Sequence, residues 1–600
     1  MKNLLKTSIA LACLATSATS YSSDKDEIVV TAKNNQSIEN VLHTVHVFNL
    51  ADIEAAQAQD IPALIDEIAG ISFRDSGGRG SVTGVFVRGG SSSQTIVLID
   101  GVRVGSATLG AAALNSYPIE AIERIEIIKG PFSGIYGADA AAGVIQLFTK
   151  KGGPGIGSVR ATVGSDSLHE FGVAFNGGNE RNSFHVAINS EETDGIDRTS
   201  ILSGGNDDID GFEETAVSLG GQVAFSDSVS AKLNILATDN EVEFDNTFGR
   251  DPGLVTETDT FSAALNVTAK LNEALTWTTT LGANEDQAIT NGSFPSDLST
   301  ERSSISSDLV VTLSDTAVLT AGVDYYEEDI ASPTTNFPVS NRDNKGVFAQ
   351  LTNKVGVIGF AASARYDDNS AYGSETNGSV ALSLELSDDI KLSSSYGTAF
   401  SAPSFNFLYF PFFGNPDIKP EESESIEIKL QGANDVLNWA IAAYKTDYTN
   451  LFSFNPSTFL AANIGEAEVE GIEANLSTEI ADWNVTVNAD ILSATNVQTG
   501  VELDGRAEQT LALKASRDFG AFDVLFNLKT ESNRFDRSGI ELASYTLFDV
   551  AANYELNDTV QFSAKIDNVF DKDYTLSLIN STQRYNTAGR QAKISVKVSF

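Results

Sequence analysis

The sequence predicts an all-β transmembrane barrel that holds a smaller mixed α/β domain inside its lumen. From about residue 153 to residue 600, apolar and polar residues alternate with a period of two between turn residues, which is typical of strands with one apolar face. The chain ends on such a strand, with an aromatic residue, Phe600, at its last position. Residues 33–152 instead combine a helical pattern with short apolar runs and glycine-rich joints.

The composition excludes several other classes of protein. The 600 residues include 39 Lys+Arg, 81 Asp+Glu and one Cys, with a net charge of -42 and 42% hydrophobic residues. A hydrophobic content near the globular norm excludes a disordered acidic tail, and the scarcity of cysteine excludes a disulfide scaffold. The acidic excess leaves no basic surface for a phosphate backbone, so no nucleic-acid partner is expected.

Residues 1–20 are predicted to be a cleaved signal peptide. Lys2 and Lys6 precede a short apolar core, and the small residues Ala18 and Ser20 precede a cleavage site before Tyr21. The only cysteine, Cys13, lies in this segment, so we expect the exported protein to contain no thiol. A lipoprotein anchor at Cys13 is the alternative, but a small residue, alanine, stands three positions earlier, where such a signal has a large aliphatic one.

The predicted barrel covers residues 153–600. Apolar and polar residues alternate over residues 380–387 and 390–396, on either side of Asp388 and Asp389, which indicates a hairpin. No stretch after the signal has the roughly 18 consecutive apolar residues of a membrane helix. A closed barrel satisfies its backbone within lipid, and the segment is long enough for roughly 18 to 24 strands of about ten residues. A barrel of that width is an open pore unless its lumen is filled.

Residues 33–152 are the domain predicted to fill it. Glycine-containing joints such as Asp100-Gly101 and Gly130-Pro131 separate its elements. The pattern predicts a helix over residues 52–69 and strands over residues 85–88, 96–99, 122–128 and 143–148.

Together these segments resemble the TonB-dependent outer-membrane receptor family over the whole mature chain. The resemblance implies about 22 antiparallel strands, a plug over residues 33–152 and active import across the bacterial outer membrane. It implies a monomer embedded in outer-membrane lipid and no enzymatic activity, in keeping with four histidines that lie in no catalytic motif. The segments that carry it are Val85-Phe86-Val87-Arg88-Gly89-Gly90, Val97-Leu98-Ile99-Asp100-Gly101-Val102, Ile122-Glu123-Arg124-Ile125-Glu126 to Lys129-Gly130-Pro131, and the terminal aromatic strand.

A short β-prone stretch lies in the N-terminal segment, residues 21–32, which we expect to be mobile. Such a stretch can pair as an added strand with the edge of another protein. It resembles the TonB box, which implies the inner-membrane energy transducer TonB as partner; the alternative is a first strand of the plug. Its residues are Asp26, Glu27, Ile28, Val29, Val30, Thr31 and Ala32.

An acidic loop suggests a calcium site. Oxygen-bearing residues at positions 206, 208 and 210 precede Gly211, as in the opening of an EF-hand loop, but Val217 occupies the twelfth position in place of the required glutamate. From the residues alone, a solvated acidic loop is an equal alternative. Vitamin B12 receptors of this family order their extracellular loops with calcium, and the resemblance implies the ligands Asp197, Asn206, Asp208, Asp210, Asp239 and Asp245.

The same resemblance implies cobalamin as the imported ligand. Two positions depart from the B12 receptors, since Gly84 replaces a serine and Ser91 an asparagine. Residues 397–404 and 414–421 resemble a mid-barrel segment that siderophore receptors share. A siderophore or haem receptor of the same architecture is therefore an alternative, and a passive porin is a less favoured one, because a pore needs neither plug nor TonB box. The implied ligand contacts are Val82, Gly84, Ser91, Leu109 and Gly110.

Overall fold

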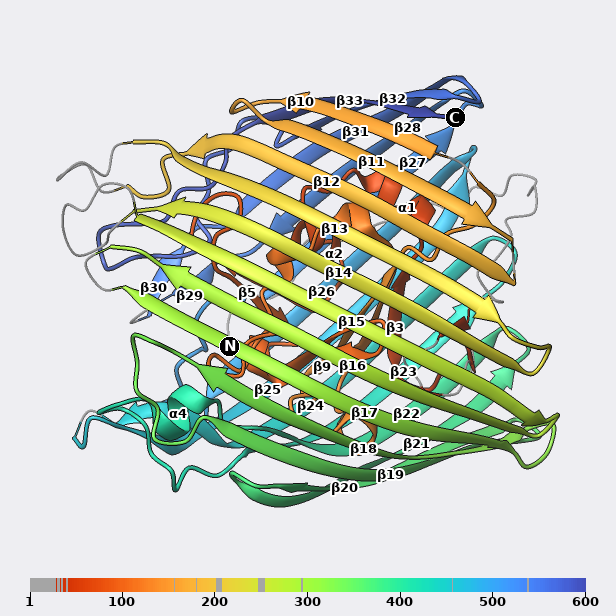
Figure 1. Ribbon diagram of the computed structural model, residues 1–600, viewed down its shortest axis with the longest axis vertical. Helices are drawn as coiled ribbons and strands as arrows, with labels where there is room; N and C mark the ends of the chain where they lie inside the picture. Colours follow the sequence, from red (N-terminus) through yellow and green to blue (C-terminus); the bar gives the residue numbers. More distant parts are fainter. Residues whose placement is uncertain are drawn as a thin grey trace, which may run out of the picture.

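The protein is described by a computed structural model that covers residues 28–29, 33, 36–38, 41–155, 157–179, 181–200, 208–245, 254–292, 295–455, 457–536 and 539–600. Over these ranges the chain forms a barrel of tilted strands with a smaller domain inside it (Figure 1). No helix in the described ranges is both long and apolar enough to cross a membrane.

Twenty-two antiparallel strands form the closed barrel, which confirms the predicted fold class. The first strand pairs with the last, where the backbone N–H of Gly157 donates to the Phe600 carbonyl at 2.9 Å. The strands are β10 (Gly157–Gly164), β11 (His169–Gly178), β12 (Asn182–Ile196), β13 (Asp210–Ala224), β14 (Val229–Phe244), β15 (Leu254–Asn272), β16 (Leu275–Thr290), β17 (Ser296–Thr312), β18 (Ala317–Ala331), β19 (Asn341–Val355), β20 (Ile358–Asn369), β21 (Gly373–Ser387), β22 (Ile390–Ser401), β23 (Glu421–Ala433), β24 (Leu437–Asn455), β25 (Leu460–Ile480), β26 (Trp483–Asn496), β27 (Gln509–Asp518), β28 (Phe522–Glu531), β31 (Tyr545–Asn557), β32 (Val560–Asp567) and β33 (Gln591–Ser599).

The alternation along the sequence reflects the two faces of the barrel wall. In β23, Glu427 and Lys429 are buried on the lumen side, whereas Ile426 and Ile428 are 49% and 54% exposed on the outer side. An apolar outer face suits lipid hydrocarbon, and a polar inner face can form hydrogen bonds and ion pairs with whatever fills the lumen.

The two ends of the barrel differ in the length of their connections. Tight turns such as Asp388–Asp389 join strands at one end. Long connections join the strands at the other end. Residues 402–420 carry the short helix α4 (Phe405–Tyr409), and the connection between β28 and β31 carries a hairpin of β29 (Arg534–Asp536) and β30 (Ile540–Leu542). Residues 568–590 form a further long connection. Transmembrane barrels have short turns on the periplasmic side and longer loops outside the cell. The end with α4, β29 and β30, on the left of Figure 1, is therefore the extracellular one.

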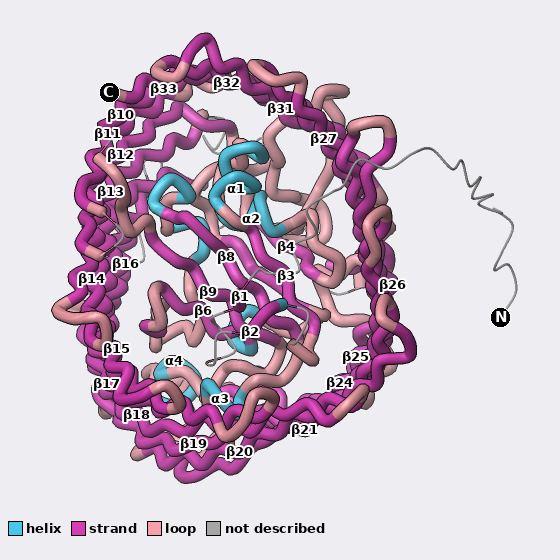
Figure 2. The backbone as a smooth tube through the Cα atoms, turned by 90° about the vertical axis from the view of Figure 1, so that its right-hand side faces the viewer, coloured by secondary structure: helices cyan, strands magenta, loops and turns pink. Residues whose placement is uncertain are grey.

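The N-terminal domain lies within the ring of barrel strands (Figure 2). Its five-stranded sheet has the order β3-β8-β9-β6-β7, in which β6 and β9 are parallel and the other pairs antiparallel. The four predicted strands correspond to β5, β6, β8 and β9. The elements are β3 (Thr44–Phe48), α1 (Leu50–Ala56), α2 (Ile61–Ile65), β4 (Ile71–Asp75), β5 (Thr83–Val87), η3 (Ser92–Gln94), β6 (Thr95–Ile99), β7 (Val102–Arg103), η4 (Leu114–Ser116), η5 (Ile119–Ala121), β8 (Ile122–Lys129), α3 (Ser133–Tyr136) and β9 (Gly143–Thr149).

The single helix predicted over residues 52–69 is wrong, because α1 and α2 are separate. Gln57 ends α1 in the left-handed region, with a φ of 45°. The Asp60 carboxylate then accepts the backbone N–H of Ala63 at 2.7 Å, and Pro62 occupies the first turn of α2. An acidic N-cap and an early proline both favour the start of a new helix. The apolar residues do follow a helical period, but these local signals end one helix and begin another.

The sheet of this domain is buried on both faces. Ile125 and Ile127 of β8 belong to the apolar cluster that includes the buried residues of α1 and α2. Ile128 and Val144 point to the opposite face, in a second cluster that includes Phe348 of the barrel strand β19. The domain therefore has a core of its own and also packs against the barrel wall.

Candidate functional site

Two loops of the inner domain reach the extracellular end of the barrel. The guanidinium of Arg198, in the long connection after β12, donates to the carbonyls of Gly77 and Arg79 at 2.9 and 2.7 Å. The second loop meets the α4 connection, where the backbone N–H of Phe405 donates to the Ala107 carbonyl at 3.0 Å. We call these two loops the apical loops, residues 76–82 and 106–111. Both are held by connections of the extracellular end.

The five predicted ligand contacts lie on or beside the apical loops. Val82 and Leu109 are 81% and 65% exposed, so their side chains are free to contact a ligand. A Cβ atom placed on Gly84 would have its nearest neighbour at 3.5 Å, which is ordinary van der Waals contact and leaves room for a small side chain. The Ser91 hydroxyl pairs with that of Ser93 at 3.0 Å. Ser93 in turn adjoins Gly110, so the loop of Ser91 borders the second apical loop. Contact with a ligand remains a prediction for all five.

An aromatic segment that the sequence analysis did not assign borders the second apical loop. Six of the nine residues 405–413 are aromatic. Phe405 is fully buried against this loop, and Phe412 is 98% exposed. Phe407 packs on Phe452 of β24 with ring centroids 5.0 Å apart. The density of aromatic residues between residues 397–404 and 414–421 was the signal that could have revealed this part of the extracellular mouth.

Three carboxylates converge among the extracellular connections. Asp197, Asp210 and Asp245 each place an oxygen within 4.8 Å of the other two. They come from the end of β12, the start of β13 and the end of β14, which are neighbours in the barrel. The backbone N–H of Arg198 donates to Asp210 at 3.1 Å, and the Thr199 hydroxyl donates to Asp245 at 2.6 Å. Ca²⁺ binds carboxylate oxygens at 2.3–2.6 Å, so two ligands on opposite sides of it lie about 5 Å apart. The spacing and the donor type therefore fit calcium.

The remaining predicted calcium ligands behave differently from these three. Asp208 is exposed, and its charge helps to raise the pKa of Asp245. Asp239 lies on the outer face of β14, because the neighbouring Asn240 is buried on the lumen side and successive residues of a strand alternate. The structure does not bring Asp239 to the cluster. Asn206 lies outside the described residues.

The carboxylate cluster is electrostatically unfavourable without a cation. Burial is the largest cause that raises the pKa of Asp245, and the charges of Asp197 and Asp208 raise it further. The hydrogen bond from Thr199 and the charge of Arg198 oppose the rise. Arg198 also donates to the first apical loop. Because Arg198 directly follows Asp197, the cluster is linked to the loop that carries the predicted ligand contact Val82.

Deeper in the lumen, buried ion pairs link the inner domain to the barrel. Arg88 lies 2.6 Å from Glu427 and 2.9 Å from Glu473, and Lys129 lies 2.8 Å from Glu473. The Arg88 guanidinium also lies over the ring of Tyr444, 4.3 Å from its centroid. All five side chains are almost fully buried, and a buried charge that loses its partner is strongly destabilising. These pairs therefore fix the position of the inner domain in the lumen.

Comparison with known proteins explains this architecture. Residues 37–144 match the TonB-dependent receptor plug domain, and residues 162–569 match the TonB-dependent receptor-like β-barrel. The chain belongs to the TonB-dependent receptor family. A protein named vitamin B12 transporter BtuB, from Photobacterium profundum, is 31% identical over 100% of both chains. A protein of the same name from Vibrio cholerae serotype O1 is 29% identical over 92% of both chains. The solved structure of the siderophore receptor PirA from Acinetobacter baumannii has a TM-score of 0.78 at 19% identity, covering 93% of this chain and 98% of its own.

As a TonB-dependent receptor, the protein is an outer-membrane importer and not an enzyme. Membership of the family implies an interaction with TonB and a transported ligand. The inner domain is its plug, and the passive porin is set aside because the plug domain occupies the lumen. The predicted signal peptide lies outside the described residues and stays a prediction.

The predicted TonB box lies mostly outside the described residues. Its two described members form the strand β1 (Ile28–Val29), which pairs antiparallel with β2 (Gln36–Ser37). This two-stranded ribbon is separate from the five-stranded sheet of the plug. Binding of the box to TonB stays a prediction. The members that are not described are Asp26, Glu27, Val30, Thr31 and Ala32.

Proposed function

We propose that this TonB-dependent receptor imports vitamin B12 or a closely related corrinoid, and that calcium orders its extracellular loops. The full-length similarity to two proteins named vitamin B12 transporters carries the proposal. The carboxylate cluster at the mouth supports it, because it provides the calcium ligands that the resemblance implies at three of the expected positions.

Calcium would be held by Asp197, Asp210 and Asp245, and the charge of Asp208 acts on Asp245 from outside this group. The bound ion supplies positive charge that offsets the repulsion among these carboxylates. The residues of the chain then fix the first apical loop, because Arg198 lies next to Asp197 and donates to two carbonyls of that loop. Fixing the loop in advance removes part of the entropic cost of ligand binding.

The ligand binds from outside, between the apical loops and the extracellular connections. Occupancy can act on the plug only if the ligand has different affinities for its resting and its activated states. The apical loops and the buried Arg88 belong to one compact domain, so a shift at the mouth reaches the ion pairs with the barrel wall. TonB then pulls on the N-terminal segment and opens a path for the ligand.

A siderophore or haem receptor of the same architecture is the second candidate. The aromatic segment of residues 405–413 is the observation that favours it, since aromatic walls suit planar and aromatic iron chelates. The charge of the protein disfavours it, because ferric siderophores are commonly anionic and the chain carries a net charge of -42.

Equilibrium binding distinguishes the two candidates. Purified receptor is titrated with cyanocobalamin and with a panel of ferric siderophores and haem, each with calcium and with chelator. The proposal expects saturable cyanocobalamin binding that calcium strengthens. Tight binding of a siderophore or of haem, without cyanocobalamin binding, would replace it with the second candidate.

A further inference from the structure

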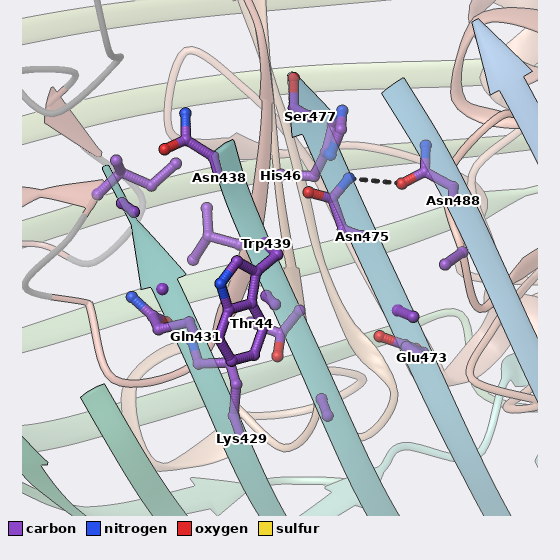
Figure 3. A pocket seen from close by; sticks show the side chains of 18 of the residues that line it. Thr44, His46, Lys429, Gln431, Asn438, Trp439, Glu473, Asn475, Ser477 and Asn488 are labelled. Carbon is purple, nitrogen blue, oxygen red and sulfur yellow. Dashed lines mark hydrogen bonds between the residues drawn. The ribbon is translucent and has the colours of Figure 1, made fainter. Parts of the chain in front are cut away.

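A cavity of about 600 Å³ lies between the plug and one side of the barrel, at the periplasmic end. The plug strand β3 forms one wall, and the barrel strands β19 and β21 to β27 contribute to the other. Figure 3 shows lining side chains from both walls, among them Thr44 and His46 of the plug and Asn475 of the barrel. The short turn of residues 388–389 is part of the lining, so the cavity reaches the periplasmic end.

The ionic side chains of the lining are largely paired with one another. Lys514 lies 2.9 Å from Glu67 of the plug, and Lys354 lies 2.5 Å from Glu385. The Lys429 ammonium donates to the backbone carbonyl of His43 at 2.8 Å. Burial lowers the pKa of the lining histidines His43 and His46 to about 4 and about 3, so both rings are neutral at physiological pH. The lining contains five lysines and six aspartates or glutamates, so little net charge remains to attract an ionic ligand.

Neutral amides and hydroxyls make up much of the remaining lining. The amide of Asn475 donates to Asn488 at 2.6 Å, and the amide of Asn488 donates to the Glu67 carbonyl at 2.9 Å. The side-chain oxygen of Asn438 is buried and has no hydrogen-bond partner among the described residues. The neutral polar lining consists of Thr44, Ser387, Gln431, Asn438, Asn475, Ser477, Asn484, Thr486, Asn488 and Ser516.

The inner end of the cavity is closed by the ion pairs that hold the plug. Glu473 and Lys129 line the cavity and also form the buried cluster with Arg88. A ligand at the extracellular mouth is on the opposite side of this cluster, because the apical loops lie at the other end of the barrel. The cavity therefore lies on the periplasmic side of the ion pairs.

We propose that this cavity is a transit site, which receives the transported ligand after it has passed the ion pairs and before it leaves the barrel. The lining selects an uncharged ligand with several amide groups, because amide oxygens and N–H groups can exchange hydrogen bonds with the asparagine and glutamine side chains. Its resting volume is that of a site for a drug-sized molecule, which is smaller than a whole corrinoid, so the transit site must widen when the plug is displaced. This ligand class rests on the proposed corrinoid function, since a corrinoid carries neutral amide side chains around its ring.

A pair of neighbouring substitutions on β24 tests the transit site. Ala440 lines the cavity and pairs with Gln431 and Asn475, whereas Ile441 is 47% exposed on the outer face. Ala440→Trp should fill part of the cavity and lower TonB-dependent uptake of radiolabelled cyanocobalamin at least about tenfold. Binding at the cell surface should stay within about twofold, which also shows that the barrel is folded. Ile441→Trp should leave uptake and binding unchanged.

Uptake at the normal rate by a correctly assembled Ala440→Trp receptor would overturn the transit site. If cyanocobalamin does not bind, the proposed function fails, and the same pair of variants is tested with whichever ferric siderophore binds. Blocked uptake of an anionic siderophore would keep the site but overturn the selection for neutral amides.

A labelling experiment tests occupancy directly and does not depend on a filled cavity. The only cysteine of the sequence, Cys13, lies in the predicted signal peptide, so Ser477→Cys would introduce a single thiol into the cavity. Cyanocobalamin under energised transport should slow its reaction with a maleimide added to the periplasm, while Asp435→Cys in an exposed turn should react at an unchanged rate. Equal labelling of Ser477→Cys with and without ligand would contradict occupancy.

Discussion

Arg88 of the plug and Glu473 of the barrel face each other as a two-point ion pair, in which Nε and Nη2 of the arginine donate to the two carboxylate oxygens at 2.9 and 3.1 Å. The two residues are 385 positions apart in the chain. Lys129 donates to the same carboxylate at 2.8 Å. Because Arg88 also lies 2.6 Å from Glu427, two barrel carboxylates neutralise the two plug cations, and Glu473 is the one that contacts both. The position of the plug therefore depends strongly on Glu473.

Glu473→Gln should loosen the plug. The substitution leaves Arg88 and Lys129 without a full counter-charge in a buried site, which costs about 3–5 kcal/mol. We expect faster proteolysis of the plug and a larger ion conductance in planar bilayers. Glu468→Gln is the control, because Glu468 pairs with Lys445 at the partly exposed outer face, where such pairs contribute about 0–1 kcal/mol. Equal conductance of the two variants would contradict a role for the buried pairs.

Val29→Pro should abolish energised uptake and leave equilibrium ligand binding within about twofold, because proline lacks the backbone donor that strand addition requires. Val29→Ile keeps the donor and the β-branched shape and should transport normally. Uptake kinetics in energised cells, compared with ligand binding to the same cells, measure the difference. Normal uptake by the proline variant would argue against the predicted role of the TonB box.

Asp197→Asn combined with Asp245→Asn should weaken calcium binding and remove the mutual enhancement between calcium and cobalamin. Reciprocity requires calcium to tighten cobalamin binding by the same factor by which cobalamin tightens calcium binding. Asp239→Asn is the matched control, since Asp239 lies on the outer face and should not alter either affinity. Isothermal titration calorimetry provides both constants. If chelator leaves the cobalamin affinity of the unsubstituted receptor unchanged, these aspartates belong to a solvated loop and not to a calcium site.

Calcium binding should weaken as the pH falls. The pKa of Asp245 lies above the usual aspartate value of about 3.9, first because of burial and then because of Asp197 and Asp208. A raised pKa in the metal-free fold favours the protonated form, so this group stabilises the metal-free fold at low pH and that contribution is lost as the pH rises through the raised pKa. Calcium offsets the loss only where the carboxylate is ionised. The rise in melting temperature on adding calcium should therefore grow from about pH 4 towards neutral pH. A rise that does not depend on pH would place the ion elsewhere.

Deletion of Phe600 should lower the amount of assembled barrel. The residue exchanges two backbone hydrogen bonds with Gly157, at 2.8 and 2.9 Å, and its ring packs on Phe175 with centroids 6.0 Å apart. Removing it opens the end of the seam between β10 and β33. The heat-modifiable fraction in outer-membrane preparations measures assembly, and Phe600→Tyr should retain it. A normal folded fraction in the deletion would contradict this expectation.

Period-two alternation predicted the strands, because one face of the barrel wall is apolar and the other polar, and the terminal aromatic strand and the family resemblance were needed to predict a membrane barrel. The same rule could have excluded Asp239 from the calcium ligands, since it lies within β14 and shares the outward parity of Leu233, which is 46% exposed. The rule does not apply to Asp245, which follows the last residue of that strand. The pairing of Arg88 with Glu473 was beyond the sequence, because it depends on how the plug is rotated within the lumen. The split of the predicted helix into α1 and α2 was missed for a different reason. Asp60 could be recognised as an N-cap from the sequence, but the apolar residues keep a helical period on both sides of it, from residue 52 to residue 69.

The pairing of β10 with β33 also determines the order of assembly. The ring cannot be complete until residue 600 has been synthesised and exported, whereas the plug emerges before any barrel strand. The plug is covalently attached to β10, one margin of the seam, while the other margin is still missing. The plug is therefore available to fold before the ring closes, and a plug that folds too slowly would meet a ring that has already closed.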